Sequence, residues 1–236
     1  MKLALIGYGS MGKLIKRMAE ERGHTISVVI DETAAGLLPD EVAQRLSGVD
    51  VVVDFTIAEA VCRNGEACVI AGVPIVEGTT GWNDKRSDVE KLVSDSDGAF
   101  VYGANFSIGV NLFYRVTDFA AELFAKFPGY EAFIEEQHHS RKKDAPSGTA
   151  LMLRDVVSNH IKKEFSISST RAGNIPGTHR VGFDGPADQI LLEHTARSRD
   201  GFAAGALMAA EWIIGTKGFY EFSDVIDEIC EHNRPS

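Results

Sequence analysis

The stretch of this sequence with the most evident chemistry is EEQHHSRKKDAPSGTAL, residues 135–151. Two histidines and three cations stand side by side there, in a chain whose formal net charge is −10. Pro146 and Ser147 follow them and are typical of the first turn of a helix, where free backbone N–H groups bind anions. Cations beside free N–H donors suit a small ligand with two carboxylates. A histidine or lysine in that place can exchange a proton with the ligand near neutral pH.

The same residues also have a plain structural interpretation. Arg141, Lys142 and Lys143 could form a solvated turn, and the two histidines could fill the end of a strand. Charge alone favours that interpretation, because most charged runs are solvated. The adjoining helix start favours a binding site, since it adds N–H donors to the cations.

A second group of residues with chemical potential is the glycine-rich run GYGSMG at the start of the chain. Gly7, Gly9 and Gly12 fit the pattern G-x-G-x-x-G, in which glycines permit a tight turn and close approach of the backbone to a pyrophosphate. Asp31 follows 19 residues after Gly12, at the position where an acidic residue holds a ribose 2′-hydroxyl. Glu32 comes next, with no arginine beside it to meet a 2′-phosphate. We therefore predict that the chain binds NADH in preference to NADPH, with NADPH as the second candidate cofactor.

The elements that must position the glycine loop are short apolar strands separated by amphipathic segments. We predict strands over 2–6, 25–31, 49–56, 73–78 and 99–103, with helices over 11–22, 58–71 and 83–96. Apolar strands alternating with helices indicate a parallel sheet covered on both faces. Small residues after the third, fourth and fifth strands would lie at the same edge as the glycine loop, where such sheets bind ligands.

The second half of the chain follows a different pattern. We predict a helix over 108–127, a strand over 130–138, a helix over 147–164, and then β-rich stretches near 166–171, 179–184 and 188–198. Strands that follow one another directly indicate an antiparallel or mixed sheet. The predicted fold class is α/β, a Rossmann-type doubly wound parallel sheet with a second α+β domain. A small-residue helix near 202–216 returns the chain, so we assign residues 1–107 and 208–236 to a dinucleotide-binding domain and residues 108–207 to a substrate-binding and oligomerisation domain.

Composition excludes several functional classes. The acidic balance, 34 acidic against 24 basic residues, argues against a nucleic-acid binder, which needs a basic surface. No apolar run approaches the roughly 18 residues of a membrane span, so we expect a cytoplasmic protein that does not bind membranes. The three cysteines include no C-x-x-C pair, and we predict neither a disulfide framework nor a metal site.

These motifs together resemble one known family. The run from Glu135 to Ala150, with its paired histidines, Lys142 and DAPSGTA, is similar to the signature of the 4-hydroxy-tetrahydrodipicolinate (dihydrodipicolinate) reductases of diaminopimelate and lysine biosynthesis. GYGSMG, DFT, GTTG and ANFSIGVN occur in the family's order, so the resemblance covers most of the chain. It implies an NAD(P)H-dependent reduction of a small cyclic dicarboxylate by a homotetramer.

The resemblance also implies roles for individual residues. His138 would donate or accept a proton, and Lys142 would donate one. His139, Gly148 and Thr149 would contact the substrate. The residues that would contact the cofactor are Gly7, Tyr8, Gly9, Ser10, Met11, Gly12, Asp31, Gly78, Thr79, Thr80, Gly103, Ala104, Asn105 and Phe106.

Two departures from the commoner family pattern fall within these motifs. The glycine loop is one residue shorter than the G-x-x-G-x-x-G of many members, and Ser140 and Arg141 stand where many have a basic pair. Two alternatives stay open at this point. One is another two-domain NAD(P)-dependent dehydrogenase, which would not account for the pairing of HHxxK with PSGT. The other is a module that senses NADH without catalysis, which would need no dicarboxylate site.

Overall fold

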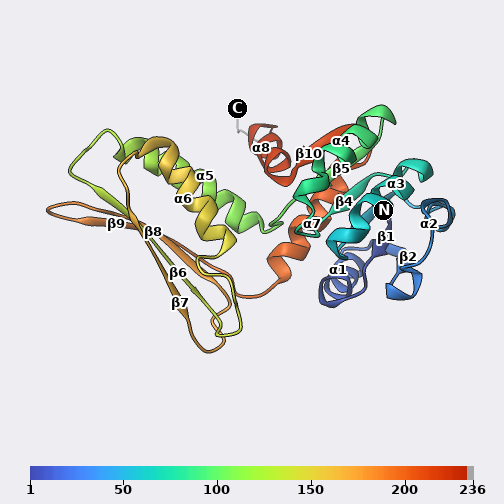
Figure 1. The fold of residues 1–236 in the computed structure, drawn as a ribbon, viewed down its shortest axis with the longest axis horizontal. Helices are drawn as coiled ribbons and strands as arrows, with labels where there is room; N and C mark the ends of the chain where they lie inside the picture. Colours follow the sequence, from blue (N-terminus) through green and yellow to red (C-terminus); the bar gives the residue numbers. More distant parts are fainter. Residues whose placement is uncertain (233–236) are drawn as a thin grey trace. The chain divides into compact units, whose positions relative to one another are not determined.

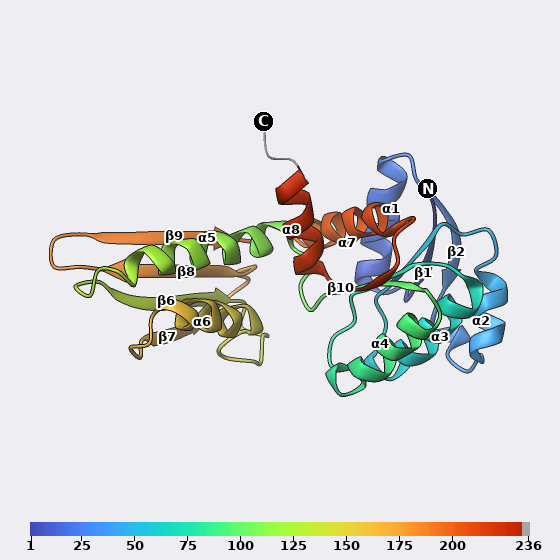
Figure 2. The same ribbon diagram turned by 90° about the horizontal axis from the view of Figure 1, so that it is seen from above.

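The structure, a computed structural model, describes residues 1–232 of the chain. It divides into two compact units. Unit 1 comprises Met1–Ile108 and the chain from Asp200 onward, and unit 2 comprises Gly109–Arg199. Figures 1 and 2 show unit 1 as a sheet between helices and unit 2 as a sheet beneath two helices.

Unit 1 is built on a six-stranded sheet in the order β10-β5-β4-β3-β1-β2, and every neighbouring pair is parallel. The strands are β1 (Lys2–Ile6), β2 (Thr25–Ile30), β3 (Val51–Asp54), β4 (Ile75–Glu77), β5 (Ala99–Tyr102) and β10 (Gly218–Glu221). All four residues of β3 and all three of β4 are buried, because helices cover both faces of the central strands. The order changes direction between β1 and β3, and sheets of this kind bind ligands at such a point.

Helices cover the two faces of this sheet from different parts of the sequence. On one face lie α1 (Ser10–Glu21), α7 (Asp200–Ile213) and α8 (Phe222–His232), packed on the side chains of Leu3, Leu5 and Val53. On the other lie α2 (Pro39–Arg45), α3 (Val61–Ala71) and α4 (Arg86–Asp95), packed on Ala4, Ile6 and Val52. Short 3₁₀ turns, η1 (Glu32–Ala34), η2 (Ala58–Ala60) and η3 (Asn83–Lys85), stand in the loops before α2, α3 and α4.

Unit 2 is a four-stranded mixed sheet in the order β7-β6-β8-β9. Its strands are β6 (Glu131–His138), β7 (Ser166–Arg171), β8 (Thr178–Asp184) and β9 (Gln189–Thr195). β6 pairs parallel with β7 and antiparallel with β8. Helices α5 (Ile108–Phe124) and α6 (Gly148–His160) cover one face, and the alternating burial of β6 turns every second side chain toward them.

The predicted fold class, a doubly wound parallel sheet with a second α+β domain, is confirmed. The sequence patterns overlooked α2, β10 and α8; α2 and β10 have only seven and four residues, whereas α8 is an amphipathic helix of 11 residues that the patterns missed. Helix α7 belongs entirely to unit 1, so the chain returns to that unit at Asp200 and not within the helix at residue 208. Its small residues permit close packing: a Cβ added to Gly205 would lie 1.8 Å from the carbonyl oxygen of Phe106.

Candidate active site

The glycine loop between β1 and α1 has no room for side chains at its first and last glycines. A Cβ added to Gly7, where φ is +88°, would lie 2.3 Å from the carbonyl oxygen of Phe55, and one added to Gly12 would lie 2.2 Å from that of Gly7. Gly9, the residue that precedes the first turn of α1, is different, because nothing lies within 4 Å of its Cβ position. The loop is therefore tightly packed at Gly7 and Gly12 and open at Gly9, next to the start of α1. This arrangement forms a suitable cradle for a pyrophosphate.

A cavity of about 880 Å³ opens above this loop, at the carboxyl ends of β1, β2 and β3. Gly7, Tyr8, Gly9 and Asp31 line it, so the structure brings together residues that the sequence predicted for one cofactor. Asp31 Oδ1 accepts hydrogen bonds from the backbone N–H of Thr33, at 3.0 Å, and from its hydroxyl, at 2.6 Å. The hydrogen bonds from Thr33 lower the pKa of Asp31, which keeps a negative charge at the cavity wall.

Two cations also line this cavity, and the sequence patterns did not single them out. Lys13 extends from the first turn of α1, and Arg63 from α3. The Arg63 guanidinium donates to the carbonyl oxygen of Ala35 and to Asn64 Oδ1, the latter at 2.8 Å. No local motif marks Arg63, because it reaches the cavity only through the packing of α3 beside the loop after β2.

A smaller cavity of about 480 Å³ adjoins the same loops and is lined by Gly9, Ser10, Met11, Gly78, Thr79 and Thr80. The loop after β4 therefore meets the glycine loop, as expected for a shared binding surface. The loop after β5 lines neither cavity, although the Gly103 N–H donates to the carbonyl oxygen of Glu77 at 3.1 Å and the ring of Phe106 lies 6.1 Å from that of Phe55. The ring of Phe106 is 2% exposed and packs against Phe222 at a centroid distance of 4.6 Å, so its side chain belongs to the core. Gly103 also faces Phe222, and Asn105 Oδ1 accepts from the backbone N–H of Ser107 at 2.9 Å.

In unit 2, the buried carboxylate of Glu136 organises the other predicted site. The period of two along β6 places Glu136 and His138 on the same, helix-covered side of the sheet. Arg171, at the end of β7, donates to both carboxylate oxygens, at 2.6 and 2.8 Å. Burial acts to raise the pKa of Glu136, but the hydrogen bonds from Arg171, Ser169 and His138 outweigh it and bring this pKa to about 2. Glu136 is therefore a permanent anion at neutral pH.

His138 ends β6 and is nearly buried, with 9% of its surface exposed. Its Nδ1 is hydrogen-bonded to Glu136 Oε2, and since an ionised carboxylate only accepts, Nδ1 carries the hydrogen. Burial lowers the pKa of His138 although the Glu136 charge opposes that effect, so the neutral ring has its lone pair on Nε2. A Cβ added to Gly177 would lie 3.2 Å from Nε2, and a glycine there leaves that nitrogen uncrowded. His138 is thus held in the tautomer that can accept a proton at Nε2.

His179, to which the sequence assigned no role, packs edge-on against His138 with ring centroids 5.0 Å apart. The register of the antiparallel pair β6 and β8 brings it there, since His179 is the partner of Glu136. Burial is the main cause that brings the pKa of His179 to about 4, so it is uncharged at neutral pH. Its Nε2 is hydrogen-bonded to the hydroxyl of Ser147 at 3.1 Å, which ties β8 to the start of α6.

The start of α6 has the geometry expected of an anion site. Ser147 caps the helix, because its Oγ accepts from the backbone N–H of Ala150 at 3.2 Å. Nothing lies within 4 Å of the Cβ position of Gly148, so the backbone is open to a ligand. The Thr149 hydroxyl is hydrogen-bonded to Tyr114, whose pKa burial raises to about 12. The first turn of α6 is therefore open at Gly148 and fixed by neighbours on both sides.

The cations predicted to surround this helix start take different positions. Lys142 Nζ lies 2.8 Å from the carboxylate of Asp144 and is three-quarters buried. Arg141 donates to Asn174 Oδ1 at 3.1 Å, and Lys143 is exposed. His139 is half-buried, and its Nδ1 is a buried atom with no hydrogen-bond partner in the described part of the chain. Such an orphaned nitrogen is expected where a ligand completes the site.

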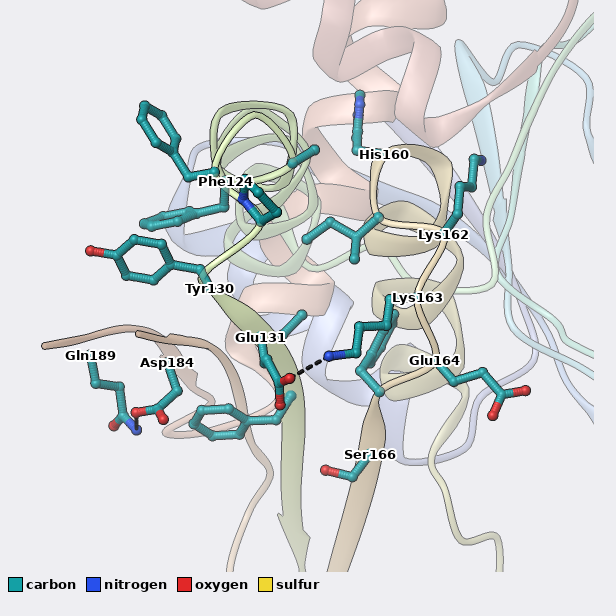
Figure 3. A pocket seen from close by; sticks show the side chains of 17 residues that line it. Phe124, Tyr130, Glu131, His160, Lys162, Lys163, Glu164, Ser166, Asp184 and Gln189 are labelled. Carbon is teal, nitrogen blue, oxygen red and sulfur yellow. Dashed lines mark hydrogen bonds and ion pairs between the residues drawn. The ribbon is translucent and has the colours of Figure 1, made fainter. Parts of the chain in front are cut away.

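A third cavity, also of about 880 Å³, lies at the other end of β6 and contains none of the predicted site residues (Figure 3). β6 has eight residues, so Glu131 at its start is about 23 Å from His138 at its end. The side chains of Glu131 and Lys163 form an ion pair at this cavity. The cavity is therefore separate from the site around His138.

Nowhere in residues 1–232 do three or more His, Cys, Asp or Glu side chains gather in an arrangement that could hold a metal ion. None of the helices described in the structure combines the length and the apolar character needed to cross a membrane.

Comparison with known proteins finds matches for both halves of the chain. The family model described as dihydrodipicolinate reductase, N-terminus, matches residues 1–106, and the model for the C-terminus matches residues 109–226. A protein of Christiangramia forsetii named 4-hydroxy-tetrahydrodipicolinate reductase is 34% identical over 244 residues, covering 98% of this chain and 100% of its own. One of the same name from Thermosipho africanus is 36% identical over 230 residues, covering 97% and 99%.

The fold has a counterpart among solved structures. The dipicolinate-bound dihydrodipicolinate reductase of a Paenisporosarcina species superposes with a TM-score of 0.76, covering 95% of this chain and 99% of that one at 22% sequence identity. The fold of the chain thus matches a solved structure, and both halves of the sequence match the family models. The family and the Rossmann-type unit together identify the chain as an oxidoreductase. Its cofactor class is a pyridine nucleotide, NAD(P)H. The resemblance seen in the motifs is confirmed: this chain belongs to the dihydrodipicolinate reductase family.

Proposed function

We propose that this protein reduces 4-hydroxy-tetrahydrodipicolinate to tetrahydrodipicolinate with NAD(P)H, a step of diaminopimelate and lysine biosynthesis. One observation carries the proposal: a buried, carboxylate-oriented His138 stands in the same unit as the open helix start at Gly148, in a chain that also contains a dinucleotide cradle. The names of the curated relatives support the reaction. Unit 1 would then bind the nucleotide and unit 2 the substrate.

The substrate would be held by charge and by backbone donors. One carboxylate would lie against the first turn of α6, where Gly148 leaves the backbone N–H groups open and Thr149 adds a hydroxyl. His139, with its unpartnered Nδ1, would donate or accept a further hydrogen bond. The related Paenisporosarcina enzyme binds dipicolinate according to its description, which supports a cyclic dicarboxylate as the ligand class.

Side chains of unit 2 would donate and accept protons in this reaction. When bound, NAD(P)H supplies the hydride, and the net reaction also takes up one proton and releases the 4-hydroxyl group of the substrate as water. Lys142, held by Asp144 at 2.8 Å, would donate a proton to the reduced substrate. His138, fixed by Glu136 with its lone pair on Nε2, would accept or relay a proton at that nitrogen.

The experiment that tests these roles is an assay of NADH and NADPH oxidation with freshly generated product of the preceding synthase. General acid or base catalysis contributes about 10² to 10⁴ in rate, so Lys142→Ala and His138→Ala should each lower kcat by roughly that factor. Nucleotide affinity should stay unchanged in both. Lys143→Ala, an exposed neighbour, is the matched control and should keep full activity. Wild-type turnover in both site variants would refute the assignment of roles, and tight nucleotide binding without any turnover would favour an NADH sensor.

We further propose that the nucleotide contacts Gly7, Tyr8, Gly9, Ser10, Met11, Gly12, Asp31, Gly78, Thr79, Thr80, Gly103, Ala104, Asn105 and Phe106. Because the Phe106 side chain is buried in the core, only its backbone is available for such a contact. Asp31 would accept from the ribose 2′-hydroxyl and repel a 2′-phosphate, which favours NADH. Arg63 and Lys13 line the same cavity and would oppose that repulsion. Comparing the dissociation constants of NADH and NADPH in the wild type and in Asp31→Asn tests the preference: equal or tighter binding of NADPH by the wild type would contradict it.

We also propose that the protein is a homotetramer that assembles through unit 2. The face of its sheet opposite α5 and α6 carries Phe133, whose ring lies over Gly182, and the exposed side chain of Leu191 beside them. Apolar groups on an uncovered sheet face are typical of an interface between copies. Light scattering during size exclusion should give four times the chain mass, and Leu191→Asp should reduce it. A monomeric wild type would overturn this part of the proposal.

A cytoplasmic location belongs to the same proposal. Cys62, Cys68 and Cys230 are all free thiols, and Cys230 is exposed. Free exposed thiols are usual in a reducing compartment. Fractionation of the source cells would test the location, and recovery outside the cytoplasm would contradict it.

A further inference from the structure

Two neighbouring strands of unit 1 end in buried carboxylic acids that the proposed reaction does not use. Asp54 is the last residue of β3 and Glu77 the last of β4, and both are 0% exposed. They are register partners in the parallel pair β3 and β4. Partners in register point to the same face of a sheet, so the two carboxyl groups lie side by side in the interior.

Each of these groups has one satisfied and one unsatisfied oxygen. Asp54 Oδ2 accepts from the side-chain amide of Asn64 at 2.6 Å, and Glu77 Oε1 accepts from the backbone N–H of Thr79 at 2.7 Å. Asp54 Oδ1 and Glu77 Oε2 are buried without a hydrogen-bond partner among the described residues. A single proton between these two oxygens would satisfy both, and the two side chains are within hydrogen-bonding reach of each other.

The surroundings offer little to stabilise two negative charges. Two titratable groups on α3 lie near the pair: the charge of Arg63 acts on Asp54, and Cys68 is a buried thiol whose pKa is raised well above its usual value by burial first and then by Asp54 and Glu77. The Arg63 guanidinium is engaged with Asn64 and with backbone carbonyl groups. Burial raises the pKa of Asp54, and burial together with the Asp54 charge raises that of Glu77 well above its usual value. Two adjacent buried carboxylates cannot both ionise without a large penalty.

The pair is connected directly to the walls of the two cavities in unit 1. Glu77 holds the backbone of Thr79, and the Thr79 hydroxyl accepts from the backbone N–H of Thr56 at 3.0 Å. Trp82 adds a hydrogen bond from its indole N–H to the carbonyl oxygen of Thr79 at 2.9 Å. Thr56 lines both cavities and Thr79 lines the smaller one. The loops after β3 and β4 are therefore fastened to each other and to the carboxyl pair.

We infer that Asp54 and Glu77 share one proton at neutral pH, and that this neutral Glu77 is a positioning residue for the nucleotide site because it holds Thr79 and Thr56 in place. Only the positioning role of Glu77 rests on the proposed nucleotide site; the shared proton does not depend on it. Ionising Glu77 would put two negative charges in contact, and the loops that line the cavities would have to move apart. Glutamine at position 77 would preserve the arrangement without a proton, since its amide can donate to Asp54 while its carbonyl oxygen accepts from Thr79.

The first experiment detects the proton and does not depend on the cofactor. Infrared spectra of the wild type at neutral pH should contain the carbonyl stretch of a protonated carboxylic acid, and Glu77→Gln should lack it. Glu66→Leu, an exposed site on α3, is the matched control and should retain the band. A wild-type spectrum without this band would overturn the shared proton.

The second experiment measures nucleotide affinity by fluorescence titration with NADH and NADPH. Glu77→Gln should bind as tightly as the wild type, within about twofold, whereas Glu77→Leu leaves the backbone N–H of Thr79 and Asp54 Oδ1 without partners and should bind roughly tenfold more weakly. A tenfold loss in Glu77→Gln, or an unchanged affinity in a folded Glu77→Leu, would overturn the positioning role. The glutamine comparison decides the matter even if the leucine variant does not fold. A wild type that binds neither nucleotide would refute the proposed nucleotide site, and the infrared result would still test the shared proton.

Discussion

Replacing Glu136 by glutamine should destabilise the protein strongly, and the loss should depend on pH in a defined direction. Glu136 has a side chain with no exposed surface and a bidentate ion pair with Arg171. Its pKa is about 2 in the folded protein, against an ordinary value near 4.3. A difference of that size corresponds to about 3 kcal/mol of stability at pH 7.

The sign follows from the depressed pKa. Stability that comes from a carboxylate with a lowered pKa is fully present above the unfolded value and is lost as pH falls toward the folded value. The contribution of Glu136 should therefore be about 3 kcal/mol at pH 7 and roughly 1.4 kcal/mol at pH 3. Glutamine cannot titrate, so the gap in unfolding free energy between wild type and Glu136→Gln should narrow by more than 1 kcal/mol over that range, by the same linkage.

Urea unfolding at a series of pH values measures this gap. Trp82 and Trp212 both belong to unit 1, so tryptophan fluorescence follows that unit, while far-UV circular dichroism also reports the sheet of unit 2. The matched control is Glu135→Gln, next along β6, whose side chain is 43% exposed and lies 3.6 Å from Arg180. An exposed pair of this kind contributes about 0 to 1 kcal/mol. A gap that does not change with pH, or an equal loss in Glu135→Gln, would refute the reasoning.

Two further predictions concern His138, the proposed catalytic histidine, and the glycine loop. Removing the charge of Glu136 should lower the pKa of His138 further, so the acidic limb of the kcat profile should move to lower pH in Glu136→Gln; a limb that stays in place would contradict the proposed pairing. Gly9→Ala should fold with nearly the wild-type melting temperature and yet weaken NADH binding, because its Cβ would enter only the open space of the cradle. Gly12→Ala should instead lower the melting temperature, since its Cβ would lie 2.2 Å from the Gly7 carbonyl oxygen, and similar melting curves for the two variants would contradict this distinction.

The motifs that identify this protein are local, which is why the sequence alone was enough to find them. A glycine loop needs a strand, a turn and a helix within a dozen residues, so its sequence pattern is contiguous. The same holds for the run from His138 to Thr149, where the cations and the helix start are contiguous. Strong β-branched runs also predicted the central strands, because a strand buried on both faces requires nearly continuous apolar residues.

The partners of these motifs were decided only by the tertiary structure. Arg171 lies 35 residues from Glu136, and the two meet because β6 and β7 pair side by side. His179 reaches His138 through the register of β6 with β8. No local pattern marks such contacts, since a single buried charge in a strand has no periodicity of its own.

The carboxyl pair of Asp54 and Glu77 is likewise visible only in the tertiary structure. In the sequence they are ordinary acidic residues at the ends of two apolar runs, 23 positions apart. Only the parallel register of β3 and β4 places them together, and only the helices above them exclude water from both. The sequence by itself determined the family and pointed to the residues proposed for its chemistry, because the motifs that contain them are contiguous. The fold decided the burial, charge and protonation of their neighbours, because these properties depend on what long-range pairing brings within a few ångströms.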